Sequence, residues 1–370
     1  RVQKYIPGVP GWRQVNINGF GDRNNSGAWS LGVFSGKLYA STSNDSGAEV
    51  YRLSPTGAWE RVATGGFGDA SNVGIDRLTE FNGQLYASTW VEDGSGAQIW
   101  RSPSGAAGTW SQVAQGGLGS TNNNEFMALT PFNGYLYTGA WVGNPSIHGA
   151  EIWRSSTGAS GSWTRVASNG FGDPNNSVIL TMKIFNGALY AATANTTTGG
   201  EVWRSGDGQQ WIQVNANGFG RVENSHVISL EVFGGKLYAG TWNSSTGAEI
   251  WRTASGTSWE RVMQGGFGAA NNRNIAALVA FRSELFALMG NSETGAEVWR
   301  SASGDTNSWT KVIDGGFGSG RGALLAWDNH VAVSDGALYI GTYTFGNSGG
   351  RVWKYLPNKT YLPLLRRGSQ

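Results

Sequence analysis

The feature that most constrains the fold is a short phrase that recurs along the chain. Residues 295–302 read GAEVWRSA, and close copies begin at residues 47, 96, 149, 199, 247 and 349. Successive copies are separated by 48 to 54 residues. Self-similarity at a nearly constant period is typical of repeat architectures, so the chain is expected to be one array of similar units.

Each repeat contains four short runs that alternate apolar and polar residues or carry β-branched and aromatic side chains. Clusters of Gly, Asn and Ser separate the runs, and no stretch shows a sustained 3.6-residue period. Such runs predict strands joined by hairpin turns, and four antiparallel strands per repeat are typical of a propeller blade. We therefore expect an all-β fold, a single seven-bladed β-propeller of four-stranded antiparallel blades over residues 1–370.

Two aromatic positions recur in nearly every repeat and are expected to pack neighbouring blades together. The first begins the expected fourth strand and comprises Trp12, Trp59, Trp110, Trp163, Trp211, Trp259 and Trp309. The second lies in the third strand and comprises Tyr51, Trp100, Trp153, Trp203, Trp251, Trp299 and Trp353. The recurring GFG motif is expected to fill the gap between blades with its Phe, while the third-strand pair Glu297 and Arg300 is expected to form ion pairs across blade boundaries.

Both ends of the chain offer outer strands for the last blade, so one strand pair is surplus. The segment GWRQV at 11–15 matches the fourth-strand pattern, and RVQKYIPG at 1–8 nearly copies RVWKYLPN at 351–358. We predict that segments 1–16 and 357–370 act as closing strands or as strands exchanged with a second molecule. The residues expected to carry these contacts are Val2, Tyr5, Ile6, Trp12, Val15, Tyr361, Leu362, Leu364 and Leu365.

Features that differ between repeats are the candidates for binding. Trp29, Trp90, Trp141, Trp242 and Trp327 lie outside the two recurring tryptophan positions. Aromatic rings beside amides are typical of saccharide sites, but the same rings can simply fill space between blades. Both interpretations remain open for the predicted ligand-binding residues, which are Trp90, Trp141, Trp242, Tyr343, Asn44, Asn195, Asn243 and Asn291.

Catalytic signatures are weak in this sequence. The three histidines, His148, His226 and His330, lie in different repeats, and acidic residues such as Asp76 and Glu125 stand isolated in expected inner strands. No motif for nucleophilic, metal or paired-carboxylate chemistry is recognised. We therefore predict that the chain is not an enzyme and that it has no catalytic residues, no metal site and no cofactor.

Composition excludes several classes of partner. A net charge of +2 argues against nucleic acid, and no apolar run is long enough for a transmembrane segment. The chain has no cysteine, and charged residues make up only 14% of it. Together with many Gly, Asn, Ser and Trp residues, this composition predicts an extracellular or cell-surface protein.

One turn resembles a known family. Residues 205–211 read SGDGQQW, which is similar to the Asp-box (BNR) repeat of sialidase-like propellers, a Ser-x-Asp-x-Gly-x-x-Trp pattern between the third and fourth strands. Other repeats keep the Ser and the Trp but lose the Asp. Because the box is a structural turn in that family, the resemblance implies a propeller fold and does not imply an activity.

These observations lead to one preferred function and two alternatives. The preferred function is a non-catalytic binding and assembly module, polymerising through its terminal strands. The first alternative is a carbohydrate-binding lectin that uses the loop-face Trp and Asn residues. The second is a sialidase-like glycosidase. The expected partners are therefore further copies of the chain, carbohydrate, or both.

Overall fold

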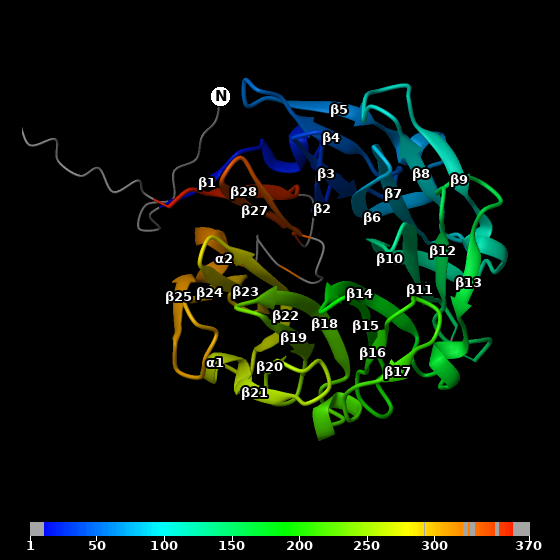
Figure 1. Cartoon of the computed structure of the whole chain (residues 1–370). Coiled ribbons are helices and arrows are strands. Elements are labelled where there is room, and N and C mark those ends of the chain that lie inside the picture. The colour runs from blue at the N-terminus through cyan, green and yellow to red at the C-terminus, as the bar shows by residue number, and fades with distance from the viewer. Residues whose placement is uncertain are drawn as a thin grey trace, which may run out of the picture.

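The computed structural model describes residues 11–144, 146–291, 293–320, 325, 330–344 and 348–357. Within these ranges the chain consists of antiparallel strands, loops and four-residue helical turns. Figure 1 shows the strands grouped into successive sheets around a central axis, with β2, β6, β10, β14, β18 and β22 nearest to it. The prediction of an all-β propeller is confirmed.

The strands pair in consecutive sets of four, and each set is named here after its first strand. The β2 sheet comprises β2 (Gly27–Phe34), β3 (Lys37–Ser43), β4 (Val50–Leu53) and β5 (Trp59–Ala63), and the β6 sheet comprises β6 (Asn72–Phe81), β7 (Gln84–Val91), β8 (Ile99–Ser102) and β9 (Ser111–Ala114). The β10 sheet comprises β10 (Asn123–Phe132), β11 (Tyr135–Val142), β12 (Ile152–Ser155) and β13 (Thr164–Ala167), and the β14 sheet comprises β14 (Val178–Phe185), β15 (Ala188–Ala194), β16 (Val202–Ser205) and β17 (Ile212–Gln213). The β18 sheet comprises β18 (His226–Phe233), β19 (Lys236–Trp242), β20 (Ile250–Thr253) and β21 (Glu260–Met263), and the β22 sheet comprises β22 (Asn272–Phe281), β23 (Glu284–Asn291), β24 (Glu297–Ser301) and β25 (Trp309–Ile313).

The last sheet joins the two ends of the described chain. It comprises β26 (Val331–Ser334), β27 (Ala337–Thr342), β28 (Arg351–Tyr355) and the N-terminal strand β1 (Trp12–Gln14). Trp12 lies opposite Tyr355 in this pairing, stacks on it with ring centroids 4.7 Å apart, and is only 2% exposed. Strand β1 therefore closes the ring by completing a sheet whose other strands come from the far end of the sequence.

The hydrophobic core lies between neighbouring sheets. One cluster joins Tyr39 and Val50 of the β2 sheet to Ile75 and Leu85 of the β6 sheet, and similar clusters span other boundaries. A single sheet buries its faces only against its neighbours, so each sheet depends on the next for stability.

Short helical turns connect the sheets and carry the GFG motif. They are η1 (Asn18–Gly21), η2 (Gly65–Gly68), η3 (Gly116–Gly119), η4 (Asn169–Gly172), η5 (Asn217–Gly220), α1 (Gly265–Gly268) and α2 (Gly315–Gly318). In η2 the aromatic residue itself has a positive φ, 64° at Phe67, which turns its ring onto Trp100 with centroids 4.9 Å apart. The motif therefore relies on left-handed backbone at Phe67 as well as at its glycines.

For Glu297 and Arg300 themselves, the expectation of ion pairs across blade boundaries is wrong, whereas Arg252, at the place of Arg300 in the β18 sheet, pairs across the boundary with Asp305 at 2.6 Å. Glu297 pairs with Lys311 of its own sheet at 3.2 Å, and Arg300 pairs with Glu284 of the same sheet at 3.3 Å. The reason is that the antiparallel neighbours within the sheet place these partners closer than the next sheet does.

Candidate functional site

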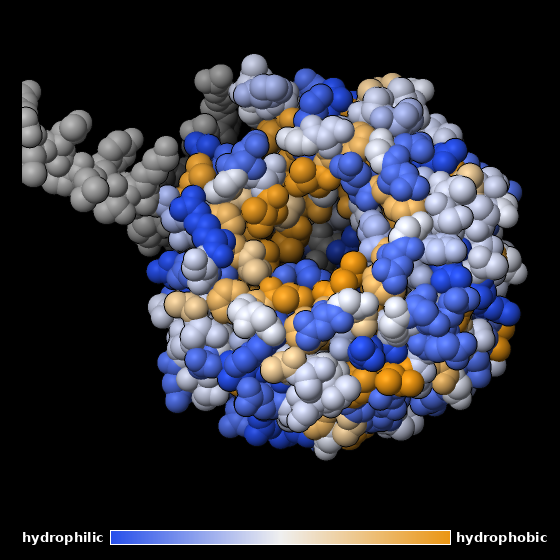
Figure 2. All heavy atoms as spheres, in the orientation of Figure 1, coloured by the Kyte–Doolittle hydropathy of each residue, from blue (hydrophilic) through white to orange (hydrophobic). Residues whose placement is uncertain are grey.

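The predicted aromatic residues lie where one sheet passes to the next near the axis. At the end of most second strands, one residue forms a bridge to the first strand of the following sheet. These bridges pair Trp90 with Glu125, Trp141 with Val178, Trp242 with Asn274, and Tyr343 with Gly27. Figure 2 shows that the ring is hollowed at its centre on the face turned toward the viewer, and that hydrophobic residues border part of the hollow.

Trp29 brings two of these aromatic residues into one cluster. Its ring stacks against Trp90 with centroids 6.2 Å apart and meets Tyr343 edge-on at 5.8 Å. The three rings come from three different sheets and are half-buried. His330 packs edge-on against Trp29 at 5.4 Å. We call these four residues, with Asp76 and Glu125, the inner aromatic cluster.

A bulge in the first strand turns Trp29 out of the regular sheet pattern. The register of β2 against β3 shifts between Ala28 and Leu31, and the register of β6 against β7 shifts in the same way between Ile75 and Arg77. The corresponding residue in β6 is Asp76. An extra residue in a strand re-aims the side chain that it carries, so the two bulges bring Trp29 and Asp76 together.

Asp76 and Glu125 form a buried carboxyl pair. The Trp29 Nε1–H donates to Asp76 Oδ1 over 2.7 Å, and Asp76 and Glu125 share a side-chain hydrogen bond. Both are almost completely buried, at 0% and 3% exposure. Burial raises the pKa of Asp76 to about 7, and burial together with the neighbouring Asp76 raises the pKa of Glu125 well above its usual value. The pair therefore holds at least one proton at neutral pH.

The view that Asp76 and Glu125 stand isolated is wrong. They belong to the first strands of adjacent sheets, which lie side by side in the folded propeller. Trp29 lies outside the two recurring tryptophan positions, but it is not among the predicted site residues. Its position in the inner strand, with an acid at the matching place one repeat later, was the available signal.

The opposite side of the propeller's centre is lined by apolar side chains. Met127, Leu180 and Ile228 cluster with Val178 and Trp242. His226 lies beside Trp242 with ring centroids 5.5 Å apart, and burial lowers the pKa of His226 to about 4. In His330, burial likewise lowers the pKa to about 4, and its Nε2 atom has no hydrogen-bond partner among the described residues. Both imidazoles are therefore neutral at physiological pH.

The four asparagines predicted as ligand contacts have structural roles instead. Asn44, Asn195, Asn243 and Asn291 are between 0% and 4% exposed. In Asn243, the Nδ2–H donates to Asn224 Oδ1 over 3.0 Å, while Oδ1 accepts the Thr246 N–H over 2.9 Å. Equivalent bonds hold the other three. Their amides are used up in capping the turn after the second strand, so they are removed from the ligand site.

Only some of the predicted closing residues lie within the described ranges. Trp12 begins β1, and the Val15 N–H donates to Val352 O over 2.9 Å, so both belong to the closing sheet. Val2, Tyr5, Ile6, Tyr361, Leu362, Leu364 and Leu365 lie outside the described residues, as does Trp327.

The described part of the chain has neither a metal-binding cluster nor a membrane-spanning helix. In that part, no three His, Cys, Asp or Glu side chains gather in a way that could hold a metal ion. No helix in those same ranges has the length and apolar character needed to span a bilayer.

Comparison with solved structures identifies the fold. A scan of protein-family models finds no match, and no curated protein matches the chain. The WD40 β-propeller domain of Doa1 is similar at a TM-score of 0.55 and 12% identity, covering 92% of this chain and 96% of that one. An ancestral GH74 enzyme is similar at 0.61 and 10%, covering 90% and 48%, and the polysaccharide lyase Uly1 at 0.52 and 13%, covering 97% and 95%. This chain is a β-propeller.

The same structures correct one expectation. A GH74 enzyme and a polysaccharide lyase share this fold, which contradicts the prediction that the chain is not an enzyme. The propeller spans about half the length of the GH74 enzyme and nearly all of the lyase.

Proposed function

We propose that this β-propeller recognises a saccharide at its inner aromatic cluster. The observation that carries the proposal is the contact between Trp29, Trp90 and Tyr343, three half-buried rings contributed by three sheets. Such rings offer flat apolar surface to the C–H face of a sugar and keep polar atoms at their edges. The fully buried His330 packs edge-on against Trp29 and helps to hold that ring in place.

The carboxyl pair supports this site by holding Trp29. Asp76 and Glu125 are buried, and Asp76 accepts the indole N–H, so the pair is a positioning element for the ring. Carboxyl groups that share a hydrogen bond lie closer than the roughly 5 Å that separates the two acids of a retaining glycosidase. This pair therefore does not have the spacing of the two acids of a retaining glycosidase, whereas a sialidase-like enzyme, with a tyrosine nucleophile, would not depend on such a pair.

One other observation supports a carbohydrate ligand. The solved structures that share the fold include a GH74 enzyme and a polysaccharide lyase. The turn that resembles the Asp-box has a structural role only, since Asp207 Oδ1 accepts the N–H groups of Gln209 and Gln210, both over 2.8 Å. We place the protein at the cell surface or outside the cell, where polysaccharides are accessible.

Binding to a glycan array, followed by calorimetry with the saccharides that bind, tests the proposal. Trp90→Ala should weaken binding by at least about tenfold, or ~1.4 kcal/mol, because it removes one face of the stacking surface. Ile212→Ala, on the outer strand β17 and 56% exposed, is the control and should bind normally. An array without any signal for the unaltered protein would refute the proposal. Release of reducing ends is measured in the same samples, since enzymes share this fold.

Self-assembly through the termini is the second candidate function. It is favoured by the pairing of β28, which has β27 on one edge and β1 on the other. Both edges of β28 are therefore occupied within the described residues, so a strand contributed by segment 357–370 would need an edge on a second copy. Removing residues 358–370 should abolish oligomers in light scattering, whereas removing only 366–370 should leave them intact. A monomeric full-length chain would exclude this function.

A further inference from the structure

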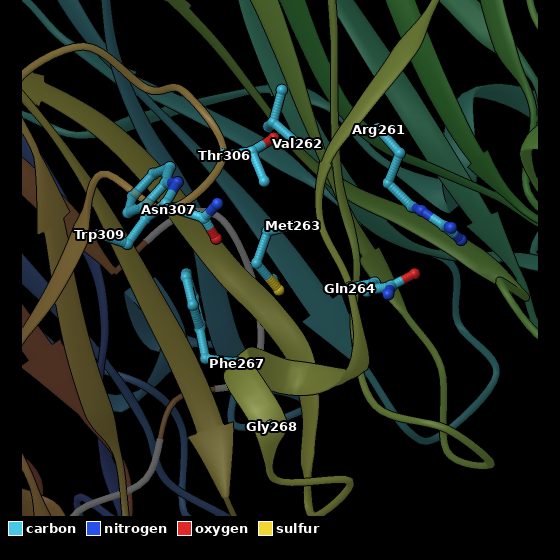
Figure 3. Close-up of a pocket in the computed structure, with 9 residues that line it drawn as sticks. All are labelled: Arg261, Val262, Met263, Gln264, Phe267, Gly268, Thr306, Asn307 and Trp309. Atoms are coloured by element: carbon cyan, nitrogen blue, oxygen red, sulfur yellow. The ribbon is translucent and has the colours of Figure 1, made fainter.

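A pocket of about 480 Å³ lies between the outer strands of the β18 and β22 sheets. The inner aromatic cluster, in contrast, lies on the inner strands of other sheets. Figure 3 shows the lining of the pocket, contributed by β21, the helical turn α1 and the turn before β25. The lining residues are Arg261, Val262, Met263, Gln264, Phe267, Gly268, Thr306, Asn307 and Trp309. Its size falls within the range of small-molecule sites.

The floor of the pocket is apolar and held rigidly. Phe267 has a φ of 58° and stacks on Trp299 with centroids 4.2 Å apart and planes 7° apart. Trp309 packs against the same ring at 5.5 Å, and Met263 is buried beside them. Figure 3 shows the ring of Phe267 pointing toward the space between Met263 and Trp309. The floor is therefore a preformed aromatic surface.

The polar side of the pocket comes from a turn that is locked across the sheet boundary. Arg252 of the β18 sheet, only 9% exposed, donates to Asp305 Oδ1 over 2.6 Å and to Gly304 O over 3.3 Å. Within the turn, the Gly304 N–H donates to Ser301 Oγ over 2.7 Å. These bonds hold the next two residues, Thr306 and Asn307, at the edge of the aromatic floor.

The neighbouring boundary offers a natural comparison. A pocket of about 540 Å³ lies between the β14 and β18 sheets over Phe219 and Trp259. There the matching turn, residues 253–259, is two residues shorter than residues 301–309, and it contributes Thr257 and Ser258. The longer turn therefore adds an amide, that of Asn307, which the neighbouring pocket lacks at this place.

The charge of the pocket indicates an uncharged ligand. Among the described residues that line the pocket, Arg261 is the only charged one, and its guanidinium already pairs with Glu249 Oε1 at 3.0 Å. A flat aromatic floor bordered by an amide from Asn307, an amide from Gln264 and a hydroxyl from Thr306 matches a ring with one apolar face and several hydroxyl groups.

We propose that the rim pocket over Phe267 and Trp309 is a binding site for a neutral saccharide unit, separate from the inner aromatic cluster. Thr306 and Asn307 bind its hydroxyl groups, and the aromatic floor contacts its apolar face. This site does not require the function proposed above, because its residues belong to other strands and face the periphery.

The test uses the full chain carrying Trp90→Ala, so that any binding at the inner cluster is weakened. The probes are maltose, cellobiose, lactose and mannobiose, followed by saturation-transfer NMR and calorimetry. Adding Thr306→Val and Asn307→Gly should weaken binding about tenfold, which corresponds to two lost hydrogen bonds. Glycine is chosen because Asn307 has a φ of 66°, where alanine would strain the turn.

Thr257→Val, in the neighbouring pocket, is the matched control and should leave the affinity unchanged. Both altered turns are exposed, so thermal unfolding should show that each variant folds normally. Absence of binding by the Trp90→Ala chain, or equal affinity with and without the Thr306 and Asn307 changes, would overturn the proposal. Failure at the inner cluster alone would leave the rim result standing.

Discussion

At the residue scale, a buried third-strand glutamate organises most sheets. Glu49 accepts hydrogen bonds from Asn25 Nδ2 over 2.9 Å and from Arg61 over 2.8 Å. Burial opposes its ionisation, but these bonds and that of Tyr51 lower the pKa of Glu49 on balance. Its stabilising contribution is therefore present above the usual glutamate pKa and is lost as the pH falls through the lowered value.

Glu201, in the β14 sheet, lacks the cationic partner. Gln213 occupies the place of Arg61, opposite Trp203, and burial raises the pKa of Glu201. A raised folded-state pKa means that stability falls as the pH rises past the usual value near 4.3. Gln213→Arg should therefore stabilise the protein by about 0.5 kcal/mol at pH 7 and by little at pH 4, measured by urea unfolding.

The β6 sheet provides the control for this prediction. There the glutamate is replaced by Gln98, whose Oε1 accepts a hydrogen bond from Gln112. Gln112→Arg should not increase the free energy of unfolding at pH 7, because the new arginine has no buried glutamate at this place to pair with. Equal stabilisation by both substitutions would contradict the explanation.

The buried carboxyl pair should make stability depend on pH. Because the pKa values of Asp76 and Glu125 are raised in the folded state, stability should fall as the pH rises from about 4, the usual carboxyl value, through 7. Asp76→Asn removes one of the two ionisations and keeps an acceptor for Trp29. It should flatten this fall by on the order of 2 kcal/mol in thermal unfolding between pH 5 and 8. Parallel pH profiles for the two proteins would contradict it.

At the element scale, the helical turns between sheets combine left-handed backbone with close packing. In η2, Gly65 and Gly66 have similar φ values of 55° and 61°. A Cβ on Gly66 would lie 2.9 Å from Asn72 Cβ, whereas a Cβ on Gly65 meets nothing within 4 Å. The two glycines therefore separate backbone strain from steric contact.

Alanine substitutions in η2 should show this difference. Gly65→Ala should cost about 1 kcal/mol from backbone strain alone, and Gly66→Ala about 1–3 kcal/mol more, because it also collides with Asn72. Equilibrium unfolding in urea measures both. Equal losses would show that the contact with Asn72 is relieved by local movement.

At the scale of the whole molecule, β1 holds the ring closed. Trp12 packs on Tyr355 and Phe317, so it joins the N-terminal strand to the end of the chain and to the preceding sheet. Closure places the last sheet against the first, and Trp29 then meets Tyr343 and His330. The inner aromatic cluster is thus a product of closure.

Loss of Trp12 should therefore act on the whole ring. Trp12→Ala should destabilise by about 3–5 kcal/mol, and hydrogen exchange should increase first in β26–β28. Trp59→Ala, at the same place in a sheet formed from contiguous chain, should cost less, since Trp59 is only partly buried. If protection from hydrogen exchange were lost equally in all sheets, the idea that the ring opens first at β1 would be contradicted.

The sequence by itself determined the order of strands, their grouping and the recurring aromatic packing. Each of these follows from the local alternation of apolar and polar residues and from its recurrence in every repeat. Strand pairing by GWRQV also followed from its match to the fourth-strand pattern, and the structure places Trp12–Gln14 on β28.

Only the tertiary structure decided which side chains form the site. Trp29, Asp76 and Glu125 belong to three consecutive sheets and are brought together by sheet packing and by two bulges, while ring closure adds Tyr343 and His330. Asn243 and its equivalents are expected to bind ligand because the sequence cannot distinguish an asparagine that caps a turn from one that contacts a ligand. Burial distinguishes them, and the buried partner of Asn243, Asn224, lies 19 residues earlier in the chain, so that only folding brings the two together.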